Sequence, residues 1–163
     1  MQRDVFVEHG RRLDLVAPLV CDLLADGATP EMPVRGNSMR PVLRDGDRVR
    51  LVPMTHAGAR LGDVVLRVEP SGPIVHRVVG WWPARGGWRL LTKGDGALRL
   101  DSPLPPAGLV GRVVARVRGN SVRQFEGPAM RLHAWVRAFR SLIAGLVVEA
   151  WDRARGRARS TGY

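Results

Sequence analysis

The sequence predicts a mainly β protein: a compact antiparallel sheet, coiled or closed into a barrel, with one helix towards each end of the chain. Three observations support this fold class. The chain has 163 residues, and 45% of them are hydrophobic, which is enough for one buried core. It contains 19 glycines and 12 prolines, which indicate frequent turns between short strands. Short runs of β-forming residues fill the middle of the chain, whereas both flanks have helical periodicity.

The N-terminal segment, residues 1–32, is predicted to hold an amphipathic helix from Arg11 to Ala25, which Pro18 should bend or shorten. Charged residues interrupt this helix, so we expect it to pack on the protein rather than to cross a bilayer. The only cysteine, Cys21, lies within the apolar pattern. It cannot form an internal disulfide, and we expect it to be a small buried side chain.

The middle segment, residues 33–126, is predicted to form the sheet. Turn signals at 45–47, 70–73, 83–87 and 103–108 separate its β-type runs, a spacing that favours an antiparallel barrel or coiled sheet over a βαβ arrangement. The runs are RVRLVP, GDVVLRV, PIVHRVV, WRLLT and GRVVARVRG.

Three tryptophans flank the predicted turn at 83–87: Trp81, Trp82 and Trp88. We expect them to pack within the sheet as cross-strand aromatics. The alternative is an exposed hairpin tip that touches lipid or a peptide.

The C-terminal segment, residues 127–163, is predicted to be an amphipathic helix with a basic tail. Apolar residues recur at threes and fours from Leu132 to Ala150, and the segment carries seven arginines against two carboxylates. We expect the apolar stripe to pack against the sheet. The alternative is binding to an anionic membrane surface, because the opposite face is rich in arginine.

Charge and composition narrow the function classes. The net charge is +11, and the positive side chains are 25 arginines and a single lysine, Lys93. This excess alone is weak support for nucleic-acid binding, which we do not expect to be specific. No secretory signal and no uninterrupted apolar run of about 20 residues occurs, so we expect a cytoplasmic protein, with a location peripheral to the membrane as the alternative. A Cys-rich metal site is excluded, and no cofactor is expected.

The most informative stretch runs from Val34 to Val49. In it, Gly36 permits close backbone approach, Pro41 fixes φ soon after the serine, and a turn at 45–47 returns the chain to a strand. Ser38 is therefore held at a rigid corner. Taken alone, this pattern favours a structural turn.

The motif Gly-x-Ser-Met-x-Pro-x-Leu-x-x-Gly-Asp-x-Val in this stretch resembles the nucleophile box of the serine peptidases that include signal peptidase I and the self-cleaving SOS repressors. Later boxes resemble the histidine-using signal peptidases of the archaeal and endoplasmic-reticulum type. These boxes are 62–65, 73–80 and 92–95, followed by Asp101. The resemblance covers residues 33–120 and implies the signal-peptidase type of sheet.

The resemblance implies a role for each matching residue. Ser38 matches the nucleophile and His76 the general base, while Asp101, with Asp95 as the second candidate, matches the acid that orients the histidine. The Ser38 backbone N–H is the expected oxyanion donor. In the same motif, Met39 and Pro41 are the expected substrate-binding residues.

Other polar residues receive no catalytic role. Lys93 is the only lysine that a Ser-Lys mechanism could use, but we expect it to belong to a turn that positions Asp95. Three acidic residues, Asp45, Asp47 and Asp63, are expected to shape turns. The remaining histidines match no box and are expected to be structural or solvated; they are His9, His56 and His133.

The expected function is a serine endopeptidase that cleaves an extended precursor or leader peptide, with small residues near the cut by resemblance. Two alternatives stay open. One is a catalytically inactive peptide-binding or scaffold module. The other is a nucleic-acid-binding regulator related to the SOS repressors, which is disfavoured because residues 1–32 are too short for a helix-turn-helix domain with its linker and no Ala-Gly self-cleavage site precedes Ser38.

Overall fold

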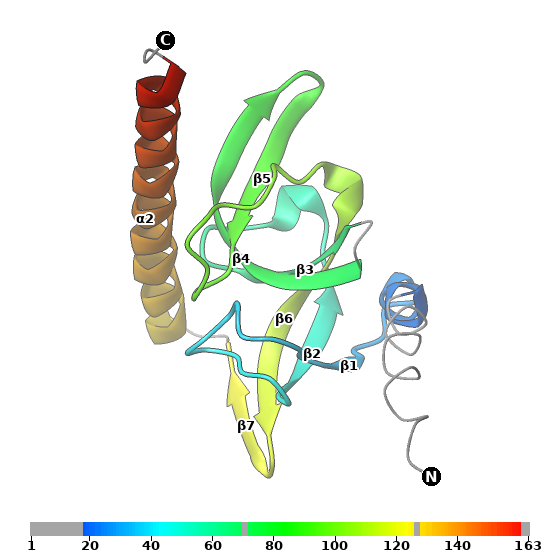
Figure 1. The fold of residues 1–163 in the computed structure, drawn as a ribbon. Coiled ribbons are helices and arrows are strands. Elements are labelled where there is room, and N and C mark those ends of the chain that lie inside the picture. Colours follow the sequence, from blue (N-terminus) through cyan, green and yellow to red (C-terminus); the bar gives the residue numbers. More distant parts are fainter. Residues whose placement is uncertain (1–17, 70–71, 126–127, 161–163) are drawn as a thin grey trace, which may run out of the picture.

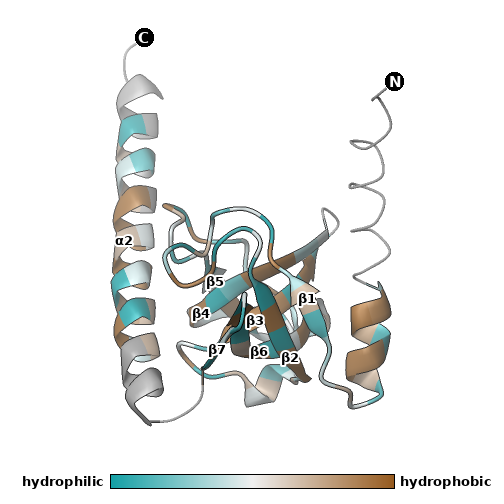
Figure 2. Ribbon diagram, turned by 90° about the horizontal axis from the view of Figure 1, so that it is seen from below, coloured by the Kyte–Doolittle hydropathy of each residue, from teal (hydrophilic) through white to brown (hydrophobic). Residues whose placement is uncertain are grey.

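The computed structural model describes residues 18–69, 72–125 and 128–160, except the side chains of residues 128–133, 149, 153 and 156–160. It contains an antiparallel sheet of seven strands that does not close into a barrel. A short helix at residues 18–25 and the long helix α2, Pro128–Ser160, lie on opposite sides of this sheet (Figures 1 and 2). The mainly β prediction with two flanking helices is therefore confirmed, and the sheet takes the open form.

The strands pair in the order β1-β2-β6-β3-β4-β5, and β7 pairs with β6 on the edge that β6 shares with β3. Strand β6 is thus the centre of the sheet. Short 3₁₀ turns, η1 (His56–Gly58) and η2 (Pro106–Gly108), connect strands. The strands are β1 (Glu31–Pro33), β2 (Arg48–Pro53), β3 (Val64–Glu69), β4 (Gly72–Ala84), β5 (Gly87–Lys93), β6 (Leu109–Arg118) and β7 (Ser121–Gln124).

The N-terminal helix packs on the sheet through Val20 and Leu24, which join the largest cluster of buried side chains. Of the helix predicted from Arg11 to Ala25, the part before residue 18 lies outside the described residues. Cys21 is only half-buried, because it lies beside the packed stripe rather than within it, so the prediction of full burial was wrong. Burial, and secondarily the charge of Asp22, raise the pKa of its thiol.

Helix α2 packs against β4 through a narrow face of small side chains. Ala138 and Leu142 contact Val79 and Leu91, and Gly145 approaches Leu100 so closely that a Cβ there would lie 2.9 Å from Leu100 Cγ. The helix can lie this close because its small residues place little or no side-chain volume between the helix backbone and the sheet.

The bulky apolar residues of α2 lie next to this packed face and remain exposed, so the prediction that the stripe is buried holds only in part. Figure 2 shows apolar segments along α2 on a helix that stands beside the sheet rather than under it. The exposed members are Trp135, Val136, Phe139, Ile143, Leu146, Val147 and Trp151. Leu132 belongs to the predicted stripe, but its side chain lies outside the described residues. No helix within the described part of the chain is both long enough and apolar enough to span a membrane.

The tryptophans of the β4–β5 hairpin are also exposed, so the prediction that they pack within the sheet was wrong. Trp88 is 62% exposed, and Trp81 and Trp82 are exposed as well. In the register of the hairpin, no tryptophan lies directly opposite another, because Trp82 pairs with Arg89 and Trp88 with Pro83. The expected directly opposed aromatic pair is therefore not formed.

Candidate active site

The serine corner is a turn anchored by buried side chains after Ser38 and by a surface hydrogen bond before it. Met39 and Leu43 are buried in the main core, and the Leu43 amide donates to the Met39 carbonyl at 3.0 Å. On the other side, the Gly36 amide donates to Asp45 Oδ1 at 2.9 Å, and Gly36 has a φ of +81°. Ser38 itself is exposed, so the turn presents its hydroxyl on a rigid base.

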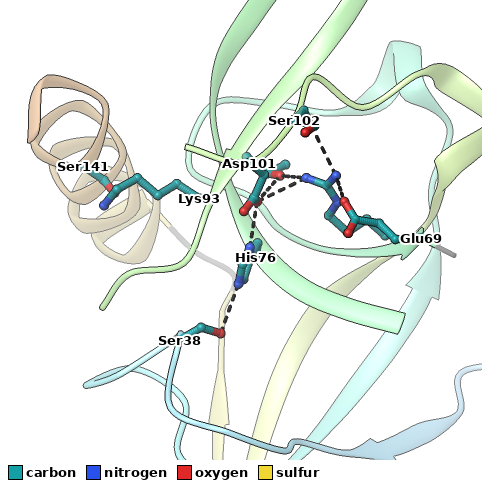
Figure 3. A network of polar contacts seen from close by, with 9 residues as sticks. Ser38, Glu69, His76, Lys93, Asp101, Ser102 and Ser141 are labelled. Atoms are coloured by element: carbon teal, nitrogen blue, oxygen red, sulfur yellow. Dashed lines mark hydrogen bonds and ion pairs between the residues drawn. The ribbon is translucent and has the colours of Figure 1, made fainter. Parts of the chain in front are cut away.

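The Ser38 hydroxyl lies within hydrogen-bonding distance of His76, on strand β4. The distance from Ser38 Oγ to His76 Nε2 is 3.0 Å, and His76 Nδ1 lies 2.7 Å from Asp101 Oδ2 (Figure 3). The imidazole therefore bridges a hydroxyl and a carboxylate. With Nδ1 protonated and donating to Asp101, Nε2 is the nitrogen that accepts the serine proton.

The carboxylate of Asp101 is held by two further groups. Thr92 on β5 donates its hydroxyl proton to Asp101 Oδ2 at 2.6 Å, and Arg67 Nη1 lies 3.1 Å from the same oxygen. Burial favours the neutral acid, but the hydrogen bonds from His76 and Thr92 and the charges of His76 and Arg67 outweigh it, so the pKa of Asp101 lies below its usual range. Asp101 is therefore ionised behind the imidazole.

Arg67 supports this carboxylate from inside the protein. It is 1% exposed, and its guanidinium also pairs with Glu69 and donates to the Ser102 carbonyl (Figure 3). Neither Arg67 nor Thr92 was predicted as a site residue. Thr92 is the first residue of the box at 92–95, to which the resemblance assigned no role for a threonine. Arg67 could have been noticed as a charged residue within the apolar run from Val64 to Val68.

Gly94 lets the loop after β5 pass close to both reacting groups. A Cβ at this position would lie 2.5 Å from the Ser38 carbonyl oxygen and 3.0 Å from His76 Nε2. Two residues later, the Gly96 amide donates to the same Ser38 carbonyl at 2.7 Å. The loop thereby fixes the serine corner against the histidine, which requires glycine at 94.

Asp95 lies away from the imidazole and contacts Arg77 instead. The Arg77 guanidinium donates to both carboxylate oxygens of Asp95 at 2.7 Å and also donates to the Gly62 carbonyl. Because His76 and Arg77 are consecutive on a strand, their side chains leave opposite faces of the sheet. Of the two predicted carboxylates, Asp101 lies beside His76, whereas Asp95 pairs with Arg77.

Lys93 is buried against α2. Its Nζ donates to Ser141 Oγ at 2.9 Å, and Figure 3 shows its side chain directed towards α2 and away from Ser38. Burial lowers the pKa of this ammonium, although the charges of Asp95 and Asp101 oppose the change. The expectation that Lys93 lies in a turn was therefore wrong, because it ends β5 and ties the sheet to α2.

The two predicted substrate-binding residues have different surroundings. Met39 is buried in the core, where it anchors the turn and presents no surface to a ligand. Pro41 is exposed and lies at the edge of a cavity of about 650 Å³.

The residues expected to shape turns do so. The carboxylates of Asp45, Asp47 and Asp63 accept hydrogen bonds from the backbone amides of Gly36, Arg44 and Arg60, respectively. His56 is half-buried in η1. The predictions for His9 and His133 lie outside the described residues and side chains.

This arrangement can activate an alcohol. A serine alone is a weak nucleophile at neutral pH, but a neutral imidazole at 3.0 Å can accept its proton. A carboxylate at 2.7 Å on the other ring nitrogen fixes the tautomer and stabilises the imidazolium. Within the described residues, no cluster of three or more His, Cys, Asp or Glu side chains could hold a metal ion.

Comparisons with known proteins add no assignment: no protein-family model matches the chain, and no curated protein matches it significantly.

Proposed function

We propose that this protein is a serine endopeptidase in which Ser38 is the nucleophile, His76 the general base and Asp101 the residue that orients and stabilises the histidine. One observation carries the proposal: the continuous chain of contacts from Ser38 Oγ through the imidazole to the Asp101 carboxylate. The similarity of the serine box to signal peptidases and SOS repressors supports the same roles.

The reaction follows from the contacts. His76 Nε2 accepts the Ser38 proton as Oγ attacks the peptide carbonyl, and Asp101 stabilises the resulting imidazolium. The tetrahedral intermediate collapses as the imidazolium gives the proton to the leaving amine, leaving an ester on Ser38. Water, deprotonated by the same imidazole, then hydrolyses the ester and regenerates the serine.

The Ser38 backbone N–H is our proposed oxyanion donor. Within the described residues, this amide donates to no backbone carbonyl. It belongs to the anchored turn, and a donor fixed in this way could stabilise a developing negative charge without first having to reorganise.

We propose an extended peptide as the substrate. Strand β1 is at the end of the strand order and leads within five residues to Ser38. A peptide that adds to such an edge forms main-chain hydrogen bonds and runs past the serine. This mode suits an unfolded leader or precursor segment better than a folded surface.

The test is cleavage of a mixed peptide library, with products identified by mass. Wild-type protein is expected to cut a subset of peptides, and Ser38→Ala is expected to cut none of them while its thermal unfolding is unchanged. Cleavage by Ser38→Ala at the wild-type rate would disprove the proposal. A library left intact by wild-type protein would favour the inactive peptide-binding module.

We also propose that α2 places the enzyme at an anionic membrane surface. The exposed bulky residues named above form a continuous apolar face along the helix, and Arg137, Arg140 and Arg155 are exposed beside it. Aromatic rings with nearby cations suit a lipid headgroup region, and Arg155 already lies 5.0 Å from the Trp151 ring centroid.

The test is co-sedimentation of the full chain with vesicles. Wild-type protein is expected to bind vesicles that contain phosphatidylglycerol, and Ile143→Glu should weaken this binding at least tenfold. The matched control is Val122→Glu on β7, because Val122 is 51% exposed and Ile143 is 48% exposed. Equal binding by both variants would refute the role of α2.

A further inference from the structure

The cavity beside Pro41 is separate from the contacts that activate Ser38. It has a volume of about 650 Å³ and lies between the serine turn, the loop at 60–63, strands β6 and β7, and the beginning of α2. Helix α2 is fixed there by close contact, because a Cβ on Gly62 would lie 2.9 Å from the Ala134 carbonyl carbon. The cavity is therefore a built feature of the packing between helix and sheet.

Its lining is strongly basic. Six arginines contribute to the wall, whereas Asp63 is its only acidic residue. Arg77 is neutralised by Asp95, and Arg112 Nη1 lies 4.0 Å from Asp63. Arg123 also has an interaction of its own, and the other three basic residues of the lining are Arg60, Arg116 and Arg137. The lining thus carries an excess of positive charge that an anionic ligand would neutralise.

Arg116 connects this charge to the serine turn. Its Nη1 donates to the Val42 carbonyl at 3.1 Å, while its buried Nε has no hydrogen-bond partner among the described residues. Burial is the main cause that lowers the pKa of Arg116. The positive charges of Arg118, Arg123 and Arg44 lower it further, and the negative charge of Asp47 opposes the change. A buried N–H without a partner is costly, so this guanidinium is held in place chiefly by its contact with the serine turn.

The rest of the lining is apolar, including Leu61, Phe125 and Trp135. Such a wall suits a ligand that combines an anionic group with an apolar body. A peptide segment with an acidic residue beside a hydrophobic one has this combination. A phosphodiester backbone supplies only the charge, so the apolar wall favours the peptide over a nucleic acid.

Pro41, on the wall of the cavity, is close to Ser38, whereas the part of the wall formed by Arg77 lies on the face of the sheet opposite His76. Pro41 is three residues after Ser38, so their Cα atoms are separated by at most about 11 Å. An extended peptide covers about 3.3 Å per residue, so three or four residues span this gap.

We propose that the cavity is a substrate subsite that selects precursors with an acidic residue next to a hydrophobic one, within about four residues of the scissile bond. This inference rests on the proposed peptidase function. It adds a substrate class, acidic amphipathic peptides, to the reaction.

Binding to the Ser38→Ala protein tests the subsite without catalysis. The probe is a fluorescent ten-residue peptide containing Glu-Leu and Asp-Phe pairs, compared by anisotropy with its Gln-Leu and Asn-Phe counterpart. The acidic peptide is expected to bind at least tenfold more tightly. Equal affinities would overturn the proposal, and so would tighter binding of a single-stranded oligonucleotide that competes for the same arginines.

Matched arginine variants separate a specific subsite from general charge attraction. Arg60→Gln with Arg137→Gln removes two exposed cavity arginines, and Arg85→Gln with Arg89→Gln removes two exposed arginines from the β4–β5 hairpin. The first pair should weaken acidic-peptide binding at least tenfold, and the second less than twofold at the same ionic strength. Equal losses would show that net charge alone attracts the peptide.

Wild-type cleavage of the same two peptides distinguishes the two proposals. Tighter binding of the acidic peptide without cleavage of either peptide would support the binding site in the cavity and refute the proposed peptidase activity. Cleavage at equal rates with equal binding would leave the peptidase and refute the subsite.

Discussion

Asp101→Asn removes a negative charge while keeping the size of the side chain. In the native protein, one carboxylate oxygen faces three groups: His76 Nδ1 at 2.7 Å, the Thr92 hydroxyl at 2.6 Å and Arg67 Nη1 at 3.1 Å. An amide cannot stabilise the imidazolium by charge, and it can favour the wrong imidazole tautomer. We therefore expect kcat/KM to fall by about 10⁴-fold, the loss seen when the acid of a serine triad is neutralised.

The same substitution should reduce stability. Arg67 is 1% exposed and keeps Glu69 and the Ser102 carbonyl, but it loses the second carboxylate. Losing a charged partner from a buried network costs about 2–4 kcal/mol in the free energy of unfolding. Urea denaturation at pH 7 measures this loss, and rates are compared at a temperature where both proteins are folded.

Asp95→Asn is the matched control, because it also neutralises a buried carboxylate that pairs with a buried arginine. We expect it to lower stability by a similar amount and to change kcat/KM less than tenfold. The reasoning would be refuted if the folded Asp101→Asn protein kept kcat/KM within threefold of wild type. It would also be refuted if both variants lost equal activity.

Three further substitutions test other parts of the structure. Thr92→Val removes one donor to the carboxylate behind the histidine and the acceptor that Thr92 offers to Arg67 Nη1, so kcat/KM should fall about tenfold in the peptide assay and stability by about 1–3 kcal/mol; an unchanged rate would contradict this. Gly94→Ala places a Cβ against the backbone of Ser38, and we expect at least a tenfold loss of kcat with a folded circular dichroism spectrum; full activity would show that the loop can move. The hydrogen bond from Arg118 is the main cause that lowers the pKa of Asp47, assisted by a backbone amide and opposed by burial. A carboxyl with a lowered folded pKa stabilises the protein above its ordinary pKa of about 4, and this stabilisation is lost as the pH falls through the folded pKa. Urea denaturation should therefore show a loss of wild-type stability below pH 4 that is smaller in Asp47→Asn, whereas identical pH profiles would refute the assignment.

The sequence was sufficient to predict which serine and histidine meet. The serine corner depends on local turn residues, and His76 lies in a run with a clear β pattern, so spacing and resemblance were informative. The preference for Asp101 over Asp95 rested on resemblance alone and left Asp95 open as the second candidate. The choice between them depends on how the loop after β5 returns, where the Asp101 amide donates to the Thr92 carbonyl at 3.0 Å.

Tertiary pairing explains what sequence reasoning missed. Arg67 looks like a solvated strand residue until the burial of Thr92 and Asp101 beside it is known. Periodicity indicated an apolar face on the C-terminal helix but not which part of it the sheet covers. The small residue Ala138 packs on β4, and the bulky Phe139 next to it remains exposed.

The central claim is that histidine, not lysine, activates Ser38, and a comparison of kcat/KM for His76→Gln and Lys93→Met on the same peptide tests it most directly. We predict a loss of at least about 10³-fold for His76→Gln, because no group replaces the base. Lys93→Met should stay within threefold of wild type, because the ammonium that it removes is bound to Ser141 and directed away from the serine. The reverse pattern, an active His76→Gln and an inactive but folded Lys93→Met, would contradict the mechanism.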